Sequence, residues 1–164
     1  MNVQLPRELG GVEGEALYVD THGDFSIDRI TDLARHLRTS VLKKLEKDQA
    51  ATLKKFKEDF ALDRILAKVK YVRILDEGMQ QCFITQLEDR LEQMPKVKLI
   101  IFDTFAEHFR LTDLGYNERK RLISTVLMTL MDLAQRHQLA IILVNNMKLS
   151  KKDFLSEVNP GQAQ

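Results

Sequence analysis

Short apolar runs alternate with longer amphipathic runs along the chain, and this alternation predicts strands that alternate with helices. Four short runs predict buried strands, at residues 15–19, 69–75, 97–103 and 139–144. Between them, apolar residues recur at helical spacing and predict helices over about 26–42, 60–66, 77–93 and 117–137. Such a succession is typical of a parallel sheet with helices on both faces, so the predicted fold class is α/β.

The number of predicted strands affects the expected extent of the domain. A sheet of four parallel strands has two edges with unpaired backbone groups, and proteins rarely leave such edges bare. We therefore expect that part of the domain lies outside these residues and that the fold is N-terminally incomplete. The segment 148–164 is polar and contains Pro160-Gly161, which predicts a loose tail after a core over residues 1–147.

Composition narrows the class of protein only a little. Charged residues make up 30% and hydrophobic residues 44%, as in globular proteins, and the net charge of +1 gives no whole-molecule argument for nucleic-acid binding. The longest apolar runs are much shorter than a membrane-spanning helix, and no signal peptide opens the chain, so we expect a location inside the cell. The single cysteine, Cys82, lies among the apolar residues of a predicted helix and is expected to pack there.

Polar side chains follow three of the predicted strands. Asp20 and His22 follow the first strand, Asp103 ends the third, and Asn145 and Asn146 follow the fourth. Parallel strands end at one edge of a sheet, so these side chains are expected to converge. Asp103 after four apolar residues has the form of a Walker B motif, whose carboxylate holds the water shell of a nucleotide-bound Mg²⁺ ion. The motif alone is equally consistent with an aspartate that caps the next turn.

The order of the motifs resembles a known family. A strand that ends in Asp-Thr-x-Gly-x-Phe, a Walker-B-like strand, a long helix and a strand that ends in x-Asn-[Gln/Asn]-Met follow one another here as in the RecA-type recombinases. Within that family, 59-DFALDRILAKVKYVRI-74 and 97-VKLIIFDTFAEHFR-110 resemble the eukaryotic strand-exchange recombinase paralogues, above all the group labelled C. The resemblance runs from residue 1 to about 147, and the opening residues look like the segment after the phosphate-binding loop of the family.

The resemblance implies a RecA-like P-loop ATPase core that acts in homologous-recombination DNA repair, in the nucleus and also in the cytoplasm. ATP and Mg²⁺ would be its cofactors, with Asp20 and Asp103 at the nucleotide and Asp103 holding Mg²⁺ through water. Other recombinase paralogues, in a hetero-oligomer, and single-stranded or branched DNA would be its partners. The side chains implied to face DNA are basic and would meet phosphates without reading sequence; they are Arg110, Arg119, Lys120, Arg121 and, in a second loop, Lys148.

The sequence departs from the family at three points of the implied site. No Gly-x-x-x-x-Gly-Lys-[Ser/Thr] phosphate-binding loop occurs in it. His22 stands where the family usually has the catalytic glutamate, and Asn146 where it has a glutamine that senses the γ-phosphate. A neutral imidazole accepts a proton but has no fixed negative charge, and asparagine is one methylene shorter than glutamine. These departures predict weak or absent ATP hydrolysis and leave open whether the chain is an enzyme.

Two alternatives from other classes remain. One is an interaction scaffold whose sheet edges recruit neighbouring subunits without chemistry. The other is a phosphate-accepting receiver domain, with Asp103 as the acceptor, Asp20 on the metal and Lys148 as the assisting lysine. Such a domain needs adjacent acidic residues after its first strand, whereas Asp20 and Asp24 are separated by three residues. The four histidines and Cys82 show no metal-ligand spacing.

Overall fold

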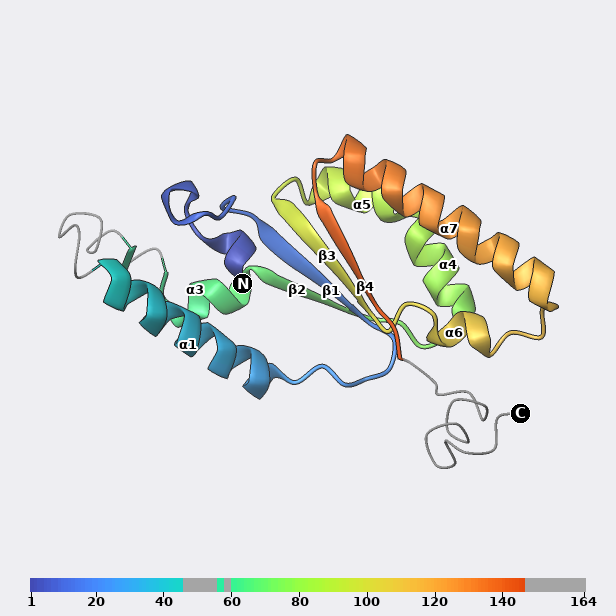
Figure 1. Cartoon of the computed structure of the whole chain (residues 1–164), viewed down its shortest axis with the longest axis horizontal. Coiled ribbons are helices and arrows are strands. Elements are labelled where there is room, and N and C mark those ends of the chain that lie inside the picture. Colours follow the sequence, from blue (N-terminus) through green and yellow to red (C-terminus); the bar gives the residue numbers. More distant parts are fainter. Residues whose placement is uncertain (46–55, 58–59, 147–164) are drawn as a thin grey trace, which may run out of the picture.

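One parallel sheet forms the centre of the computed structural model, which describes residues 1–45, 56–57 and 60–146 (Figure 1). Its strands are β1 (Glu15–Asp20), β2 (Val69–Arg73), β3 (Val97–Asp103) and β4 (Ala140–Val144). They lie in the order β2-β1-β3-β4, and every pair is parallel. The predicted α/β class and the parallel sheet are therefore confirmed, and the predicted tail at 148–164 lies outside the described residues.

Helices and 3-10 turns fill the connections between the strands. They are η1 (Asn2–Gln4), η2 (Arg7–Leu9), α1 (Ile27–Leu45), α3 (Leu62–Ala67), α4 (Glu77–Thr85), α5 (Leu87–Gln93), α6 (Glu107–Arg110) and α7 (Tyr116–Arg136). The single helix predicted over 77–93 is divided at Gln86, and the short helix α6 lies where no element was predicted. None of the described helices is long and apolar enough to cross a membrane.

The main hydrophobic core lies between one face of the sheet and helices α4 to α7, which Figure 1 shows together on one side of the strands. Alternate strand residues supply the sheet side of this core, for example Leu17 and Val19 of β1 and Ile100 and Phe102 of β3. Helical residues three or four positions apart supply the other side; they include Phe83, Leu87, Leu91, Val126, Leu130 and Leu133.

A second hydrophobic cluster joins α1, α3 and the N-terminal turn on the other side of the sheet (Figure 1). Its buried members are Leu5, Ala34, Val41, Leu45, Phe56, Phe60 and Ile65, and none of them belongs to a strand. The Gln4 amide donates to the Ile65 carbonyl at 3.1 Å and ties the N-terminal turn to α3. Helix α1 therefore packs on α3 rather than flat against the sheet.

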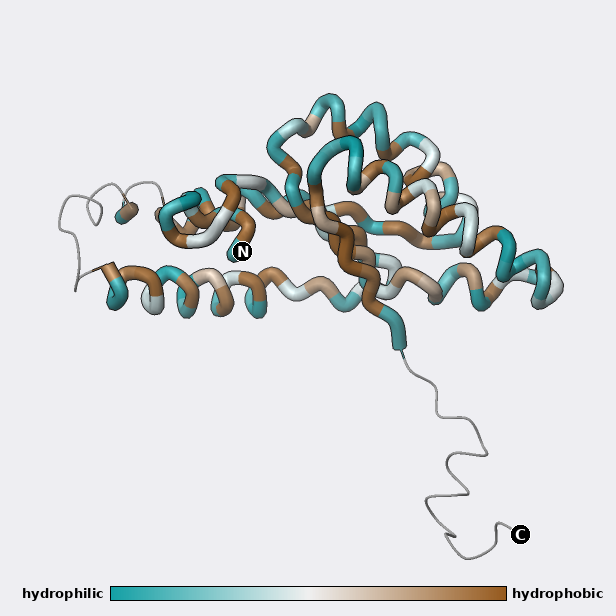
Figure 2. The backbone as a smooth tube through the Cα atoms, turned by 45° about the horizontal axis from the view of Figure 1, so that its top comes forward, coloured by the Kyte–Doolittle hydropathy of each residue, from teal (hydrophilic) through white to brown (hydrophobic). Residues whose placement is uncertain are grey.

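The face of the sheet that points away from α7 is only partly covered. Tyr71 of β2 is 46% exposed, and Ile142 and Val144 of β4 are 48% and 38% exposed. Figure 2 shows β4 as a largely hydrophobic stretch of the tube that leads toward the carboxyl end of the described chain. Parallel strands usually have both faces buried, so this exposed apolar face is an unusual feature of the fold.

The predicted packing of Cys82 is wrong, because its side chain is exposed. The buried residues of α4 are Gln80, Phe83 and Ile84, so the inward face is centred away from Cys82. Apolar spacing alone placed Cys82 inside because it could not reveal that a glutamine takes a core position.

Buried and exposed large apolar residues should respond differently to truncation. Phe102 is fully buried, so Phe102→Ala should lower the free energy of unfolding by about 3–5 kcal/mol, measured by chemical denaturation. Met131 is 72% exposed, so the control Met131→Ala should change it by less than about 0.5 kcal/mol. Equal losses for the two variants would contradict the described packing of the main core.

Candidate functional site at the carboxyl ends of the strands

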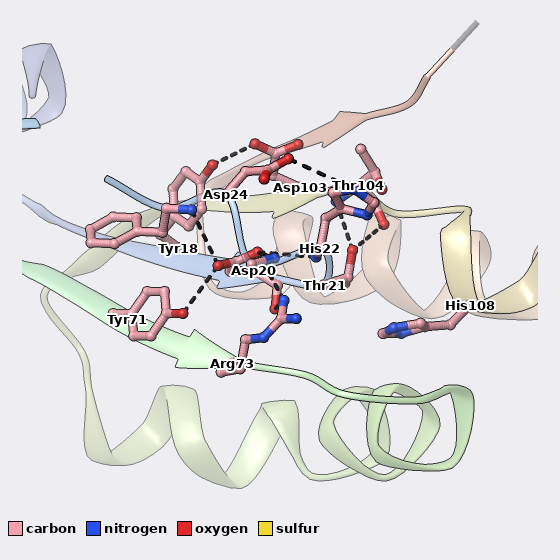
Figure 3. A network of polar contacts seen from close by, with 12 residues as sticks. Tyr18, Asp20, Thr21, His22, Asp24, Tyr71, Arg73, Asp103, Thr104 and His108 are labelled. Carbon is pink, nitrogen blue, oxygen red and sulfur yellow. Dashed lines mark hydrogen bonds and ion pairs between the residues drawn. The ribbon is translucent and has the colours of Figure 1, made fainter. Parts of the chain in front are cut away.

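The register of the sheet brings two aspartates together. Asp20, the last residue of β1, is paired with Asp103, the last residue of β3, and with Arg73 of β2 on its other side. Paired residues of neighbouring strands point to the same face, so both carboxylates lie on the partly covered face at the carboxyl edge (Figure 3). The structure thus places Asp20 and Asp103 side by side, as the sequence led us to expect.

The Asp20 carboxylate is buried and accepts hydrogen bonds from groups within the chain at both oxygens. The donors are the backbone N–H groups of His22, Gly23 and Phe25, the Tyr71 hydroxyl and the Arg73 guanidinium, at 3.1, 2.6, 3.3, 3.0 and 3.1 Å. Burial by itself would raise the pKa of Asp20, but these donors and the Arg73 charge together hold it below its ordinary value. Asp20 therefore stays ionised and organises the turn that follows β1.

Gly23 suits that turn for two physical reasons. Its φ of 96° lies in the region that favours glycine. A Cβ at this position would also lie 3.1 Å from a guanidinium nitrogen of Arg73. The glycine lets the backbone curl over Arg73 while its N–H reaches Asp20.

Asp103 is held by a tyrosine rather than by the backbone. The Tyr18 hydroxyl donates to Oδ2 of Asp103 at 2.5 Å, and the Asp103 side chain stays partly accessible. Burial and the bond to Asp103 raise the pKa of Tyr18, so its hydroxyl keeps its proton. The Phe25 ring packs on both Tyr18 and Tyr71, with centroids 5.1 and 4.6 Å away, and so positions the two tyrosines that hold the two aspartates.

Sequence reasoning missed Tyr18 and Tyr71, although a signal for them exists. Tyr18 lies two residues before Asp20 and so shares its face of the strand, and Tyr71 is its register partner on β2. The two hydroxyls reach different aspartates: Tyr18 donates to Asp103 of β3, and Tyr71 donates to Asp20 of β1.

A reciprocal pair of threonines joins the ends of β1 and β3. The Thr21 hydroxyl donates to the Thr104 carbonyl and accepts from the Thr104 N–H, both at 2.7 Å. The Thr21 N–H donates to the Asp103 carbonyl at 2.8 Å, and the Asp103–Thr104 peptide bond is cis. Both side chains are buried, so the backbone that follows Asp103 is fixed.

The two residues that replace family side chains are more loosely held. The His22 side chain is 51% exposed, and its Nε2 lies 3.9 Å from the carboxylate of Asp24, which is itself exposed. Asn146 is exposed, and its backbone carbonyl accepts from Arg110 at 3.2 Å. Neighbouring Asn145 accepts the Ala106 N–H at 2.9 Å through its side chain. The end of β4 is thus tied to α6 through its backbone and Asn145, while the amide of Asn146 faces solvent.

The basic residues expected to face DNA lie between α6 and the first turns of α7. Arg110 donates to the Asn146 carbonyl, and Arg119 donates to the Leu114 carbonyl at 3.0 Å. Lys120 and Arg121 are exposed, whereas Lys148 lies outside the described residues. The same segment exposes large apolar side chains, namely Leu111 at 74% and Tyr116 at 78%.

The described residues do not form a complete Mg²⁺ site, but one carboxylate among them could contribute to one. Among them, no group of three or more His, Cys, Asp or Glu side chains could enclose a metal ion. Magnesium in nucleotide sites is held by one or two carboxylates, by waters and by the phosphates themselves. Asp103, whose Oδ1 accepts no hydrogen bond from the described residues, fits the part of a single carboxylate that would hold Mg²⁺ through water.

Comparison with known proteins gives a consistent result. Residues 1–51 match the family model described as Rad51. The chain is 36% identical to DNA repair protein RAD51 homolog 3 of Cricetulus griseus, over 94% of the chain and 43% of that protein. It is 29% identical to the Dictyostelium discoideum protein of the same name, over 100% of the chain and 40% of the relative.

A third relative is DNA repair and recombination protein RadA of Metallosphaera sedula, 29% identical over 88% of the chain and 39% of that protein. The chain spans less than half the length of each of these relatives.

The Asp20 network predicts a pH dependence of stability. Because the pKa of Asp20 is lower in the folded than in the unfolded state, its contribution is present above the unfolded value near 3.9 and is lost as pH falls through the folded value. Asp20→Asn should lower the free energy of unfolding by about 2 kcal/mol or more at neutral pH. The free energy of unfolding of this variant should also decrease less on acidification than that of the wild type. Denaturation between pH 2 and 7 measures both effects.

Asp24→Asn is the matched control for this experiment, because Asp24 lies in the same turn with its side chain 78% exposed. It should change the stability by less than about 0.5 kcal/mol. If Asp20→Asn were as mild as Asp24→Asn at neutral pH, Asp20 would not organise the turn.

Proposed function

The chain belongs to the RecA-type recombinases of the Rad51 family, and from this we propose that it acts in homologous-recombination repair together with other recombinase paralogues, on single-stranded or branched DNA. The observation that carries the proposal is the pairing of Asp103 with Asp20 at the carboxyl edge of a parallel sheet, in a chain related to DNA-repair proteins along nearly its whole length. The proposed place of action is the nucleus, and also the cytoplasm.

The proposed nucleotide chemistry is weak. Asp103 is fixed by Tyr18 and the threonine pair, and it would hold Mg²⁺ through water when a nucleotide is bound. His22 is exposed, its ring lies near an exposed aspartate, and it has no fixed negative charge. A base that is not held in place contributes little to catalysis, because small errors in position cost large factors in rate. We therefore infer that hydrolysis of ATP is slow or absent even where the nucleotide is bound.

The proposed DNA contact lies on the segment from Arg110 to Arg121. Lys120 and Arg121 are exposed, and no acceptor within the described residues occupies them. Exposed lysine and arginine side chains bind phosphates by displacing counterions, which gives affinity without sequence preference. Exposed Tyr116 adds an aromatic surface to this segment.

The scaffold alternative is favoured by one observation, the partly exposed apolar face formed by Tyr71, Ile142 and Val144. A face of this kind is typical of a surface that another part of an assembly covers. The receiver-domain alternative has no such support, since both oxygens of Asp20, its proposed metal ligand, already accept internal hydrogen bonds.

Binding to single-stranded DNA should depend on the start of α7. The double variant Lys120→Ala with Arg121→Ala should weaken binding at every sequence and lower the salt slope of log K by about 0.7 for each phosphate that the variant no longer neutralises. Fluorescence anisotropy over a series of salt concentrations measures both. The control Lys43→Ala with Lys44→Ala removes two exposed charges from α1 and should change neither quantity. Equal effects of the two double variants would argue against a DNA contact at α7.

His22 can be tested by restoring the family residue. In a chimera that joins this chain to the preceding segment of RAD51 homolog 3, His22→Glu should raise the steady-state rate of ATP hydrolysis about tenfold or more, because a fixed base is regained. The exposed control His36→Glu should leave the rate unchanged. Unaltered turnover in the His22→Glu chimera, with nucleotide still bound, would contradict the role given to this position.

A further inference from the structure

A buried polar pair lies beside the strand ends without being part of the site described above. Gln80 of α4 is fully buried, and His108 of α6 is 6% exposed. The Gln80 Nε2 donates to the Phe105 carbonyl at 2.9 Å, and its Oε1 lies 3.1 Å from Nδ1 of His108. Figure 3 shows His108 near the end of β1, on the side of Arg73.

These contacts fix the roles of both ends of the Gln80 amide. A backbone carbonyl only accepts hydrogen bonds, so the NH₂ group of Gln80 must face Phe105 and its oxygen must face His108. The Nδ1 of His108 therefore carries the proton that it donates to Gln80. In the neutral ring, Nε2 is then without a proton.

The segment that Gln80 holds connects three strand ends. The Phe105 N–H donates to the Val144 carbonyl at 2.8 Å, and the Ala106 N–H donates to the Asn145 side chain at 2.9 Å. Immediately before them, Thr104 is paired with Thr21. Residues 104–106 thus link the ends of β1, β3 and β4, and Gln80 ties them to helices on the main-core side.

Charged groups from three elements face His108. Burial lowers the pKa of His108, and Arg73 of β2 lowers it further. Asp76 before α4 and Glu107 of α6 act in the opposite direction, as does the backbone of Thr21. The net result is a pKa below the ordinary value, so the folded pair holds the neutral ring.

We propose that Gln80 and His108 form a latch that positions residues 104–106, and with them Asp103 and Asn145. Gln80 and His108 are positioning residues, since they act on the strand ends through the backbone of Phe105. The proposal rests on the proposed function only in taking Asp103 as a residue of the nucleotide site. The latch itself is tested without nucleotide or DNA, so its failure is distinguishable from failure of the proposed function.

Hydrogen exchange followed by NMR tests the latch in the whole chain. Gln80→Met keeps the size of the side chain but removes both hydrogen bonds. The Phe105 and Ala106 amides should then exchange about tenfold faster or more, while amides in the core-facing part of α7, such as that of Leu130, keep their protection. The control Gln135→Met changes an exposed glutamine of α7 and should leave all of these amides as in the wild type.

A second variant keeps the test decisive if Gln80→Met does not fold. Gln80→Glu retains an acceptor for His108 and loses the donor to Phe105, so it should raise the pKa of His108 and still speed exchange at Phe105 and Ala106. Wild-type exchange at these two amides in a folded Gln80 variant would overturn the proposal. Equal loss of protection at Leu130 would also overturn it, because the pair would then support the core as a whole.

Discussion

The buried carboxylate of Asp20 is the constraint on which the arrangement of the strand ends depends. An ionised group taken out of water must be matched by donors, and here a turn, a tyrosine and an arginine supply them. Meeting this requirement folds residues 21–25 back over Arg73 and places the Phe25 ring against Tyr18 and Tyr71. Tyr18 in turn donates to Asp103, the carboxylate implied in nucleotide binding. The position of Asp103 therefore depends indirectly on the burial of Asp20.

The same strand ends show a division between fixed and free side chains. The Tyr18 hydroxyl holds the carboxylate of Asp103, and Thr21 and Thr104 hold the backbone next to it. The side chains of His22 and Asn146, in contrast, extend toward solvent. Catalysis needs all participating groups in place at once, while binding and assembly need only some of them. This division agrees with the proposed recombinase paralogue, in which Asp103 would hold Mg²⁺ at a bound nucleotide and assembly would matter more than turnover.

The sequence predicted the parts of the fold that depend on local pattern. The continuous apolar run at 97–103 is typical of a strand with both faces covered, and parallel order placed Asp20 and Asp103 at one edge. The sequence pattern could not predict features that depend on partners distant in the chain. Gln80 occupies a core position because Phe105 and His108, 25 and 28 residues away, satisfy its amide. Cys82, two positions further along the same helix, is exposed. The tyrosine partners of the aspartates became visible only with the strand register.

The central claim is that this chain works as a recombinase paralogue within an assembly. Sedimentation velocity of the chain mixed with a second recombinase paralogue from the same source tests it most directly. The account predicts a new, faster-sedimenting species that contains both proteins. Little of either protein should then remain at the sedimentation coefficient that it shows alone. Two proteins that sediment independently at every mixing ratio, each unchanged by the other, would contradict it.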